Sequence, residues 1–198
     1  MDDENREAQP EGRKRGSYAK GIRRRQEILD RALETFSERG YDRTSLRSIG
    51  EAIGVTHAAL LHYFPSKEAL LVEVLRERDA RGAGAVPSPP GLPGLVRGAE
   101  YNATVPGLIA LYTSMAATAA DAGNDEARLY FTERFAQLRA RIADALAQDA
   151  GEPVNAEHLS LASLIIAASD GLQIQWLLDD SVDIAAGLGL LQKLIEGS

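Results

Sequence analysis

The stretch GYDRTSLRSIGEAIGVTHAALLHYFPSKEALL, at residues 40–71, decides the fold class of this chain. It contains two short amphipathic segments separated by a glycine-valine pair, and each segment follows a Ser or Thr. Thr side chains accept hydrogen bonds from the unpaired N–H groups of a first helical turn. We therefore expect Thr44 to cap a helix that runs to Ile53, and Thr56 to cap a second helix that runs to Phe64.

A longer amphipathic segment precedes this stretch, at residues 26–39. Its apolar residues recur with helical spacing on one face, and Gly40 follows where a left-handed C-terminal cap is favoured. Two short helices joined by a tight Gly-containing turn and packed on a longer helix form a helix-turn-helix unit. The apolar residues of the long helix are Ile28, Leu29, Ala32, Leu33 and Phe36.

The remainder of the chain also reads as helical, which predicts an all-α fold of about nine to ten helices. A fourth helix is expected after Ser66, followed by a linker at residues 81–94, which hold four Gly and four Pro. We divide the chain into a mobile polar arm (1–19), a helix-turn-helix domain (20–66) and a second helical domain (67–198). Further helices are expected at 95–103, 106–120 with Pro106 in the first turn, 125–150, 155–179 and 181–195.

Composition excludes several classes of protein. The chain has 198 residues, a formal charge of -7 and no cysteine, so disulfide scaffolds, thiolate metal sites and cysteine nucleophiles are excluded. Uninterrupted apolar runs reach about five residues, whereas a membrane span needs roughly 20. The first residues are acidic and polar, unlike a secretory signal. We therefore expect a cytoplasmic protein with no membrane segment.

The charge is unevenly distributed along the chain. Residues 12–47 hold 11 basic and 5 acidic side chains, a net charge of +6, within an acidic protein. Such a local cluster indicates a polyanion met by one face. A solvated tail is the alternative. The densest part of the cluster is Arg13, Lys14, Arg15, Lys20, Arg23, Arg24 and Arg25.

The helix that follows Thr56 is the candidate recognition helix. At 100° per residue, Thr56, Ala59, Leu60, Tyr63 and Phe64 should face inward, and His57, Ala58, Leu61 and His62 outward. Outward imidazoles can meet base edges or phosphates in the major groove, and Ala58 permits close approach. Ordinary surface histidines are the alternative. The candidate DNA-binding residues are Thr44, Ser45, Arg47, Thr56, His57, Ala58, Leu61, His62, Tyr63 and Lys67.

Residues 26–72 resemble the DNA-binding domain of TetR-family transcriptional regulators. The matching positions are Gly40-Tyr41, Thr44-Ser45, Ile49, Gly54-Val55, Tyr63-Phe64 and Ser66-Lys67-Glu68. The resemblance implies a homodimer that binds a palindromic operator, acts as a repressor and is released by a small ligand. Many relatives carry a phosphate-contacting tyrosine where this chain has Leu61, so that contact should be absent, with His62 or Tyr63 as replacements.

A dimer is also expected from the C-terminal part of the sequence. Between residues 159 and 178, 13 of 20 residues are apolar and surround the helix, so every side needs a cover. We expect a second subunit to supply it through a four-helix interface shared with the preceding helix. Burial inside one subunit is the alternative. The expected seam of that preceding helix is Phe131, Phe135, Leu138 and Ile142.

A ligand site is predicted less sharply. Residues 95–120 combine apolar side chains with scattered hydrogen-bonding groups, which suits a mostly apolar, neutral small molecule. Plain core packing is the alternative for each residue. The candidate ligand-binding residues are Tyr101, Asn102, Tyr112, Met115, Phe131 and Trp176.

Catalysis is not expected, and neither a metal nor a cofactor is predicted. His57 and His62 lie about 140° apart on their helix, which makes a shared metal site awkward, and His158 stands apart from both. The sequence has no phosphate-binding glycine loop, strand-borne nucleophile or HExxH pair. The alternative to a ligand-responsive regulator is a helical DNA-binding regulator or architectural protein without an effector.

Overall fold

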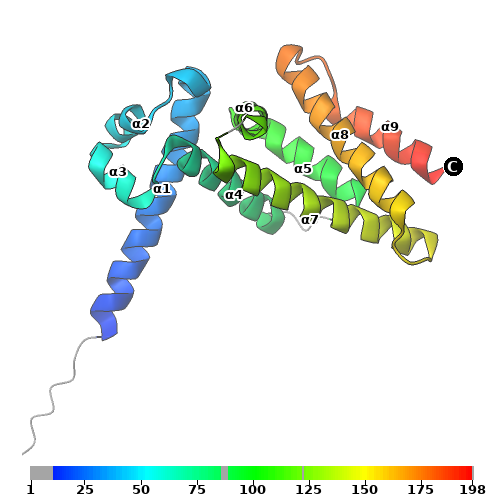
Figure 1. Cartoon of the computed structure of the whole chain (residues 1–198), viewed down its shortest axis with the longest axis horizontal. Helices are drawn as coiled ribbons and strands as arrows, with labels where there is room; N and C mark the ends of the chain where they lie inside the picture. The colour runs from blue at the N-terminus through cyan, green and yellow to red at the C-terminus, as the bar shows by residue number, and fades with distance from the viewer. Residues whose placement is uncertain (1–10, 86–88, 122, 198) are drawn as a thin grey trace, which may run out of the picture.

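A computed structural model describes residues 11–85, 89–121 and 123–197, and within these ranges the chain forms nine α-helices and no strand (Figure 1). The helices α1 to α4 build the N-terminal part, and α5 to α9 form a second layer beside it (Figure 1). The expected all-α fold is therefore confirmed. The bounds are α1 Glu11–Arg43, α2 Leu46–Ile53, α3 His57–Tyr63, α4 Lys67–Ala85, α5 Leu92–Thr104, α6 Leu108–Ala120, α7 Asp125–Ala150, α8 Ala156–Leu178 and α9 Ile184–Glu196.

The first helix is longer than its apolar pattern predicts. Helix α1 starts at Glu11, so the predicted boundary between residues 19 and 20 falls inside a helix, while residues 1–10 lie outside the described residues. The five predicted apolar residues of α1 are all buried. Gly40 interrupts the helical backbone with φ 74° and ψ 176°, a positive φ that favours glycine.

The two short helices lie where the sequence places them, but the cap of α2 is one residue later than expected. The Ser45 side chain accepts the Ser48 N–H, and the Ser48 hydroxyl accepts the Ser45 N–H, which forms a capping box. Thr44 is 2% exposed, and its hydroxyl donates to the Gly40 carbonyl at 2.6 Å. Thr44 therefore braces the preceding turn and is buried away from any surface contact, contrary to its prediction as a cap and a DNA contact.

Helix α4 begins as predicted and ends later. The Ala69 N–H donates to the Ser66 hydroxyl at 2.9 Å, which confirms the cap. The helix continues to Ala85, so the predicted linker at residues 81–94 is wrong in its first part, because i→i−4 bonding tolerates isolated glycines. At its other end α5 already starts at Leu92, with Pro93 in its first turn.

The turn between α5 and α6 touches the N-terminal part of the molecule. Pro106 lies in this turn, before α6 begins at Leu108, so it is not in the first turn of the helix as predicted. Gly107 adopts φ 76°, and a Cβ there would stand 2.6 Å from the Ser37 Cβ. This glycine therefore allows the start of α6 to pack closely on α1.

Two apolar cores hold the helices together. The first joins α1 to α4 with α6 and the start of α7, and the second joins α5, α7, α8 and α9. Phe131 and Ile142 of α7 are buried within these cores. The seam predicted on α7 for a dimer interface is therefore wrong, because these residues already pack inside one subunit.

Helix α8 is covered on one side only. Ile165 and Ile166 are buried against the second core, whereas Leu164 is 66% exposed and Leu178 is 84% exposed. By length and composition alone, α8 is the one helix among the described residues that could cross a membrane, a test that core helices also pass. Further large apolar side chains exposed on α8 and α9 are Leu159, Ile174, Leu177, Leu190 and Leu194.

Candidate nucleic-acid interface and ligand cavity

Helix α3 packs on the core through two side chains. Leu60 and Phe64 are buried, while His57, Ala58, Leu61 and His62 are all exposed, as the helical periodicity predicts. The Thr56 hydroxyl accepts the Ala59 N–H at 3.2 Å, which confirms the predicted cap. The outward face of α3 therefore combines two imidazoles with a small residue and a leucine, and it is open to a partner.

Two residues predicted to face inward are exposed instead. Tyr63 is 44% exposed and its ring lies edge-on to His62, with ring centroids 5.6 Å apart. Thr56 is exposed as well, because it precedes the helix and its side chain turns back to the N-terminal end. Both side chains widen the outward surface of α3, and the prediction that they pack inward is wrong.

The distance between α2 and α3 is set by a glycine. A Cβ on Gly50 would lie 2.6 Å from the Val55 carbonyl oxygen and 3.3 Å from the Leu60 Cδ1 atom. Any larger residue must therefore push the turn and α3 away from α2. Gly54 closes the same turn with a left-handed φ of 67°, as the sequence predicts for a helix stop.

The two candidate phosphate contacts, Arg47 on α2 and Lys67 on α4, differ in how strongly the protein itself holds their side chains. Arg47 is exposed and pairs with Glu51 at 3.1 Å along the helix. Lys67 is more constrained, because its ammonium donates to the Tyr41 carbonyl at 3.2 Å and lies 3.7 Å from the centre of the Tyr41 ring. Lys67 thus ties α4 to the turn after α1, in addition to any contact with phosphate.

Some of the basic side chains of α1 form ion pairs within the protein. Arg24 pairs with Glu27 at 2.8 Å, and Arg25 pairs with Glu73 of α4 and lies 5.5 Å from the centre of the Phe64 ring. Lys20 and Arg23 are exposed. The side chains of Arg13, Lys14 and Arg15 lie outside the described residues. Among residues 20–47, fewer cations are therefore available to DNA than the net charge of +6 over residues 12–47 suggests.

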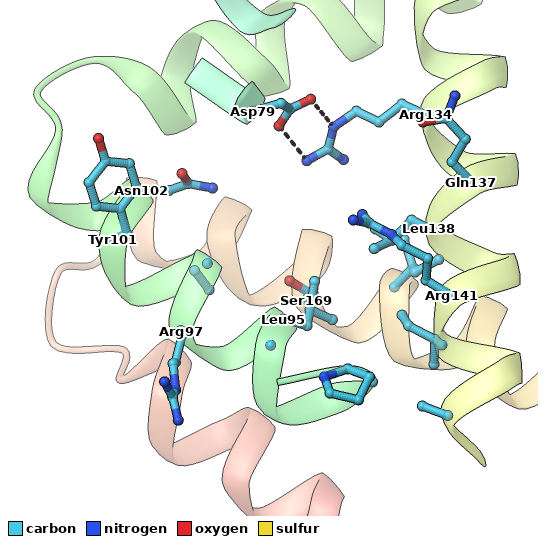
Figure 2. Close-up of a pocket in the computed structure, with 18 of the residues that line it drawn as sticks. Asp79, Leu95, Arg97, Tyr101, Asn102, Arg134, Gln137, Leu138, Arg141 and Ser169 are labelled. Carbon is cyan, nitrogen blue, oxygen red and sulfur yellow. Dashed lines mark hydrogen bonds and ion pairs between the residues drawn. The ribbon is translucent and has the colours of Figure 1, made fainter. Parts of the chain in front are cut away.

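A cavity of about 750 Å³ lies between α4, α5, α7 and α8. Figure 2 shows Tyr101 and Asn102 on α5 at one side, with Arg134 and Arg141 projecting from α7 at the other. Its volume is in the range that holds small molecules. Three of the predicted ligand residues line it, namely Tyr101, Asn102 and Tyr112.

The other three predicted ligand residues lie elsewhere. Met115 is fully buried in the first core, and Phe131 makes edge-to-face contacts with Tyr112 and Tyr130, with ring centroids 5.2 and 5.0 Å away. Trp176 packs against the second core and is absent from the cavity wall. These side chains are core, because bulky apolar residues on inward helix faces are first used for packing.

The cavity wall holds four arginines and three aspartates, so the prediction of an apolar lining with scattered hydrogen-bonding groups is wrong. Asp79 of α4 and Arg134 of α7 form a two-pronged ion pair at 2.9 and 3.2 Å (Figure 2). The Tyr130 hydroxyl donates to the same Asp79 carboxylate at 2.8 Å. This cluster joins α4 to α7 at one end of the cavity.

The same helix α4 carries ion pairs to α1. Arg78, next to Asp79, pairs with Asp30 at 2.9 Å, and Arg81 reaches the same carboxylate at 3.1 Å. Adjacent residues of α4 thus hold the long helix of the N-terminal part and the wall of the cavity. A displacement of α4 at the cavity would be passed directly to α1.

The comparisons with known proteins bear on the N-terminal part. The profile of the family described as "Bacterial regulatory proteins, tetR family" matches residues 28–74, which span α1 to α4 around the α2–α3 unit. The HTH-type transcriptional repressor Rv1474c of Mycobacterium tuberculosis is 42% identical over 74 residues, 37% of this chain and 39% of that protein. Residues 28–74 of the chain therefore have the DNA-binding domain of the tetR family. The match covers well under half of the length of that relative.

Solved structures extend the TetR-like likeness to the whole fold. FadR from Bacillus subtilis, solved in complex with stearoyl-CoA, has a TM-score of 0.66 at 17% identity and covers 85% of this chain and 95% of its own. A transcriptional regulator from Saccharomonospora viridis, solved with choline, has a TM-score of 0.67 at 23% identity, covering 88% and 96%. At such identities the likeness concerns the fold alone.

Several residues of the cavity wall are not singled out by the sequence patterns. On α7, Arg134 and Arg141 are seven residues apart and share a face with Leu138 and Ile142, so two cations interrupt an otherwise apolar stripe. On α8 the apolar run is broken by polar groups in the same way. The missed residues that line the cavity include Arg78, Asp79, Arg134, Arg141, Ser169, Asp170 and Gln173.

The pKa of Asp170 is raised mainly by burial, while the positive charge of Arg134 and the Tyr112 hydroxyl oppose the shift. The Tyr112 hydroxyl donates to Asp170 at 3.4 Å, and burial raises the pKa of this tyrosine as well. An acid whose pKa is higher in the folded state binds protons more strongly when folded, so its ionisation costs stability as the pH rises. The ionised carboxylate is thus a destabilising group in this wall.

We expect Asp170→Asn to raise the free energy of unfolding relative to the parent chain at pH 8, and the gain to vanish near pH 4. The amide oxygen still accepts the Tyr112 hydroxyl, but it carries no charge to bury. Urea unfolding at both pH values measures the difference. A variant that is less stable than the parent at pH 8 would contradict a burial cost at Asp170.

Among the described residues, no group of three or more His, Asp or Glu is arranged to hold a metal ion. His158 instead forms part of the N-terminal cap of α8, where its Nδ1 accepts the Asn155 N–H at 3.3 Å. Its Nε2 faces the Glu152 carboxylate at 3.3 Å. The third histidine therefore has a structural role in the turn between α7 and α8.

Proposed function

We propose that the chain is a cytoplasmic, dimeric transcriptional regulator that binds a palindromic operator and is released, as a repressor, by a small molecule. The observation that carries this proposal is the exposed face of α3, where His57, Ala58 and His62 stand outward on a helix anchored by buried Leu60 and Phe64. A helix presented in this way fits the major groove. The family match over residues 28–74 supports the same role.

The dimer is supported by the uncovered side of α8 and α9. Leu164, Ile174 and Leu178 on α8 are exposed together with Leu190 and Leu194 on α9. Exposed apolar faces of this extent mark interaction sites in soluble proteins. Two copies that pair these helices form a four-helix interface, and a two-fold axis would present two α3 helices to half-sites about 34–36 Å apart.

Release by a ligand is supported by the position of the cavity beside α4. A ligand there contacts the helix whose Arg78 holds Asp30 of α1, so occupancy can favour a different angle of α4. A ligand shifts such an equilibrium only by its difference in affinity for the two arrangements, typically about 1–3 kcal/mol in coupled systems.

Selection of bound sequences from random duplexes tests the proposal. We expect a two-fold symmetric site bound at least about 10³-fold more tightly than random DNA at the same salt concentration. A ratio near one would indicate an architectural protein, and release by no small molecule would leave a regulator without an effector. Neither outcome is compatible with the proposed function.

His57→Ala should change which sequences are selected, because an exposed imidazole on a helix in the major groove can read base edges. We expect a loss of about 1–3 kcal/mol on the preferred site and less on sites altered at one position. Arg47→Ala is the comparison, since an exposed cation beside the helix start should contact phosphate and weaken all sites alike. Equal losses on every sequence for His57→Ala would remove it from the base-reading residues.

A further inference from the structure

We infer that the cavity takes an amphipathic anion, whose carboxylate or phosphate is bound by Arg141 while its apolar part lies along the α5, α7 and α8 walls. This inference rests on the proposed function, because it names the class of the effector.

Most of the charged side chains in the cavity wall have partners inside the protein. Arg134 is held by Asp79, and Arg78 by Asp30. Arg97 also takes part in an interaction. Asp170 accepts a hydrogen bond from the Tyr112 hydroxyl. These groups are therefore not the first to meet an incoming charged ligand.

Arg141 differs from the other cations of the wall. It projects from α7 into the cavity beside Leu138 (Figure 2), and it has no hydrogen bond or ion pair with any of the described residues. Asp144, one turn further on α7, is an exposed acid of the same wall and does not pair with it within 4.0 Å. A guanidinium presents several donors in a plane and binds carboxylates or phosphates through two parallel bonds.

The surroundings of Arg141 specify the rest of the ligand. Leu138 and Ile142 flank it on α7, while Leu95 on α5 and Ile166 on α8 line the same cavity. These side chains supply an apolar wall next to a free cation. The polar groups Ser169 and Gln173 are buried and bonded to each other at 3.4 Å, so they present a largely satisfied surface. A polar head with an apolar tail fits this division.

The same arrangement of charges disfavours a cationic ligand. Asp79 of α4 is already neutralised by Arg134 and accepts a hydrogen bond from the Tyr130 hydroxyl. Burial raises the pKa of Asp170, which weakens it as a partner for a cation. With Asp79 paired to Arg134 and Arg78 paired to Asp30 of α1, Arg141 is the cation of the wall that no carboxylate pairs with among the described residues and that no other interaction engages.

The test uses the full chain and four probes that share a ten-carbon tail: decanoate, decyl phosphate, decanol and decyltrimethylammonium, each below its micelle concentration. Binding is measured by isothermal titration calorimetry without DNA. We expect the two anions to bind at least tenfold more tightly than decanol, and the cation to bind most weakly. The stronger of the two anions identifies the head group.

Arg141→Gln should reduce the affinity for the anions by at least tenfold and leave the affinity for decanol unchanged. Arg139→Gln is the matched control, because it removes a cation of the same helix that does not line the cavity. Equal binding of decanol and decanoate, tighter binding of the cation, no binding of either anion, or unchanged anion affinity in Arg141→Gln would overturn the inference.

A separate measurement distinguishes this inference from the proposed function. Release of the selected duplex by the bound anion is followed by fluorescence anisotropy. Anion binding without release supports the ligand class and contradicts the role of that ligand as an effector. Release by decanol alone, with no anion binding, contradicts the ligand class and supports a ligand-responsive regulator.

Discussion

Leu164→Glu should convert the proposed dimer into a monomer and lower operator affinity by about 10² or more. Leu164 is 66% exposed in the isolated subunit, so the substitution costs the fold of one subunit little. In a dimer that pairs α8 and α9, the new carboxylates would be buried without partners, at a cost that such an interface cannot offset. A single subunit then loses the gain of about 10²–10⁴ that comes from engaging two half-sites together.

The control for this substitution is Leu129→Glu. Leu129 is 56% exposed and lies near the start of α7, outside the uncovered side of α8 and α9. Light scattering coupled to size exclusion gives the mass, and anisotropy on the selected duplex gives the affinity. A Leu164→Glu chain that stays dimeric at micromolar concentration, or a Leu129→Glu chain that becomes monomeric, would refute the α8 and α9 interface.

The helix-turn-helix part could be predicted from the sequence because its signals are local. Apolar periodicity, a glycine stop and a hydroxyl cap act within a few residues, and they placed the inward Leu60 and outward His57 correctly. Errors arose where two neighbouring residues offer the same chemistry. Ser45 and Thr44 can each cap a helix, and the choice was made by burial of the Thr44 side chain beneath the turn.

The cavity could not be predicted because its chemistry depends on tertiary pairing. Composition shows Arg134 and Arg141 as similar cations, and only the fold brings Asp79 of a distant helix to one of them. Three of the predicted ligand residues, Met115, Phe131 and Trp176, were misassigned for the related reason that bulky apolar residues fill cores. Phe131 and Met115 are buried in packing, while the ligand wall uses arginines that a search for apolar residues passes over.

The predicted dimer interface agrees with the structure on α8 and disagrees with it on α7. The apolar residues around α8 predicted a cover on every side, and the subunit itself covers only the side of Ile165, while Leu164 on the other side is exposed. The partner helix was misassigned, because an i, i+4, i+7 stripe on α7 does not say whether it packs inside a subunit or between two. In the proposed dimer, the exposed leucines of α9 make this helix the second member of the interface in place of α7.

Gly50→Ala should lower the free energy of unfolding by about 1–3 kcal/mol and, more severely, abolish tight operator binding. The added methyl group would lie 2.6 Å from the Val55 carbonyl oxygen, which belongs to the backbone and cannot rotate away. The turn and α3 must therefore move outward from α2. A base-reading helix tolerates displacements of only about 0.5 Å, so binding fails even where the chain remains folded.

Gly21→Ala separates this steric effect from the general effect of alanine in a helix. Gly21 lies in α1, and a Cβ there meets no atom within 4 Å. This variant should be more stable than the parent by about 0.5–1 kcal/mol, with unchanged operator binding, because alanine restricts the unfolded chain. Urea unfolding and anisotropy on the selected duplex are measured for both variants. If Gly50→Ala binds the operator as tightly as Gly21→Ala does, the close contact between Gly50 and the Val55 carbonyl does not set the position of α3.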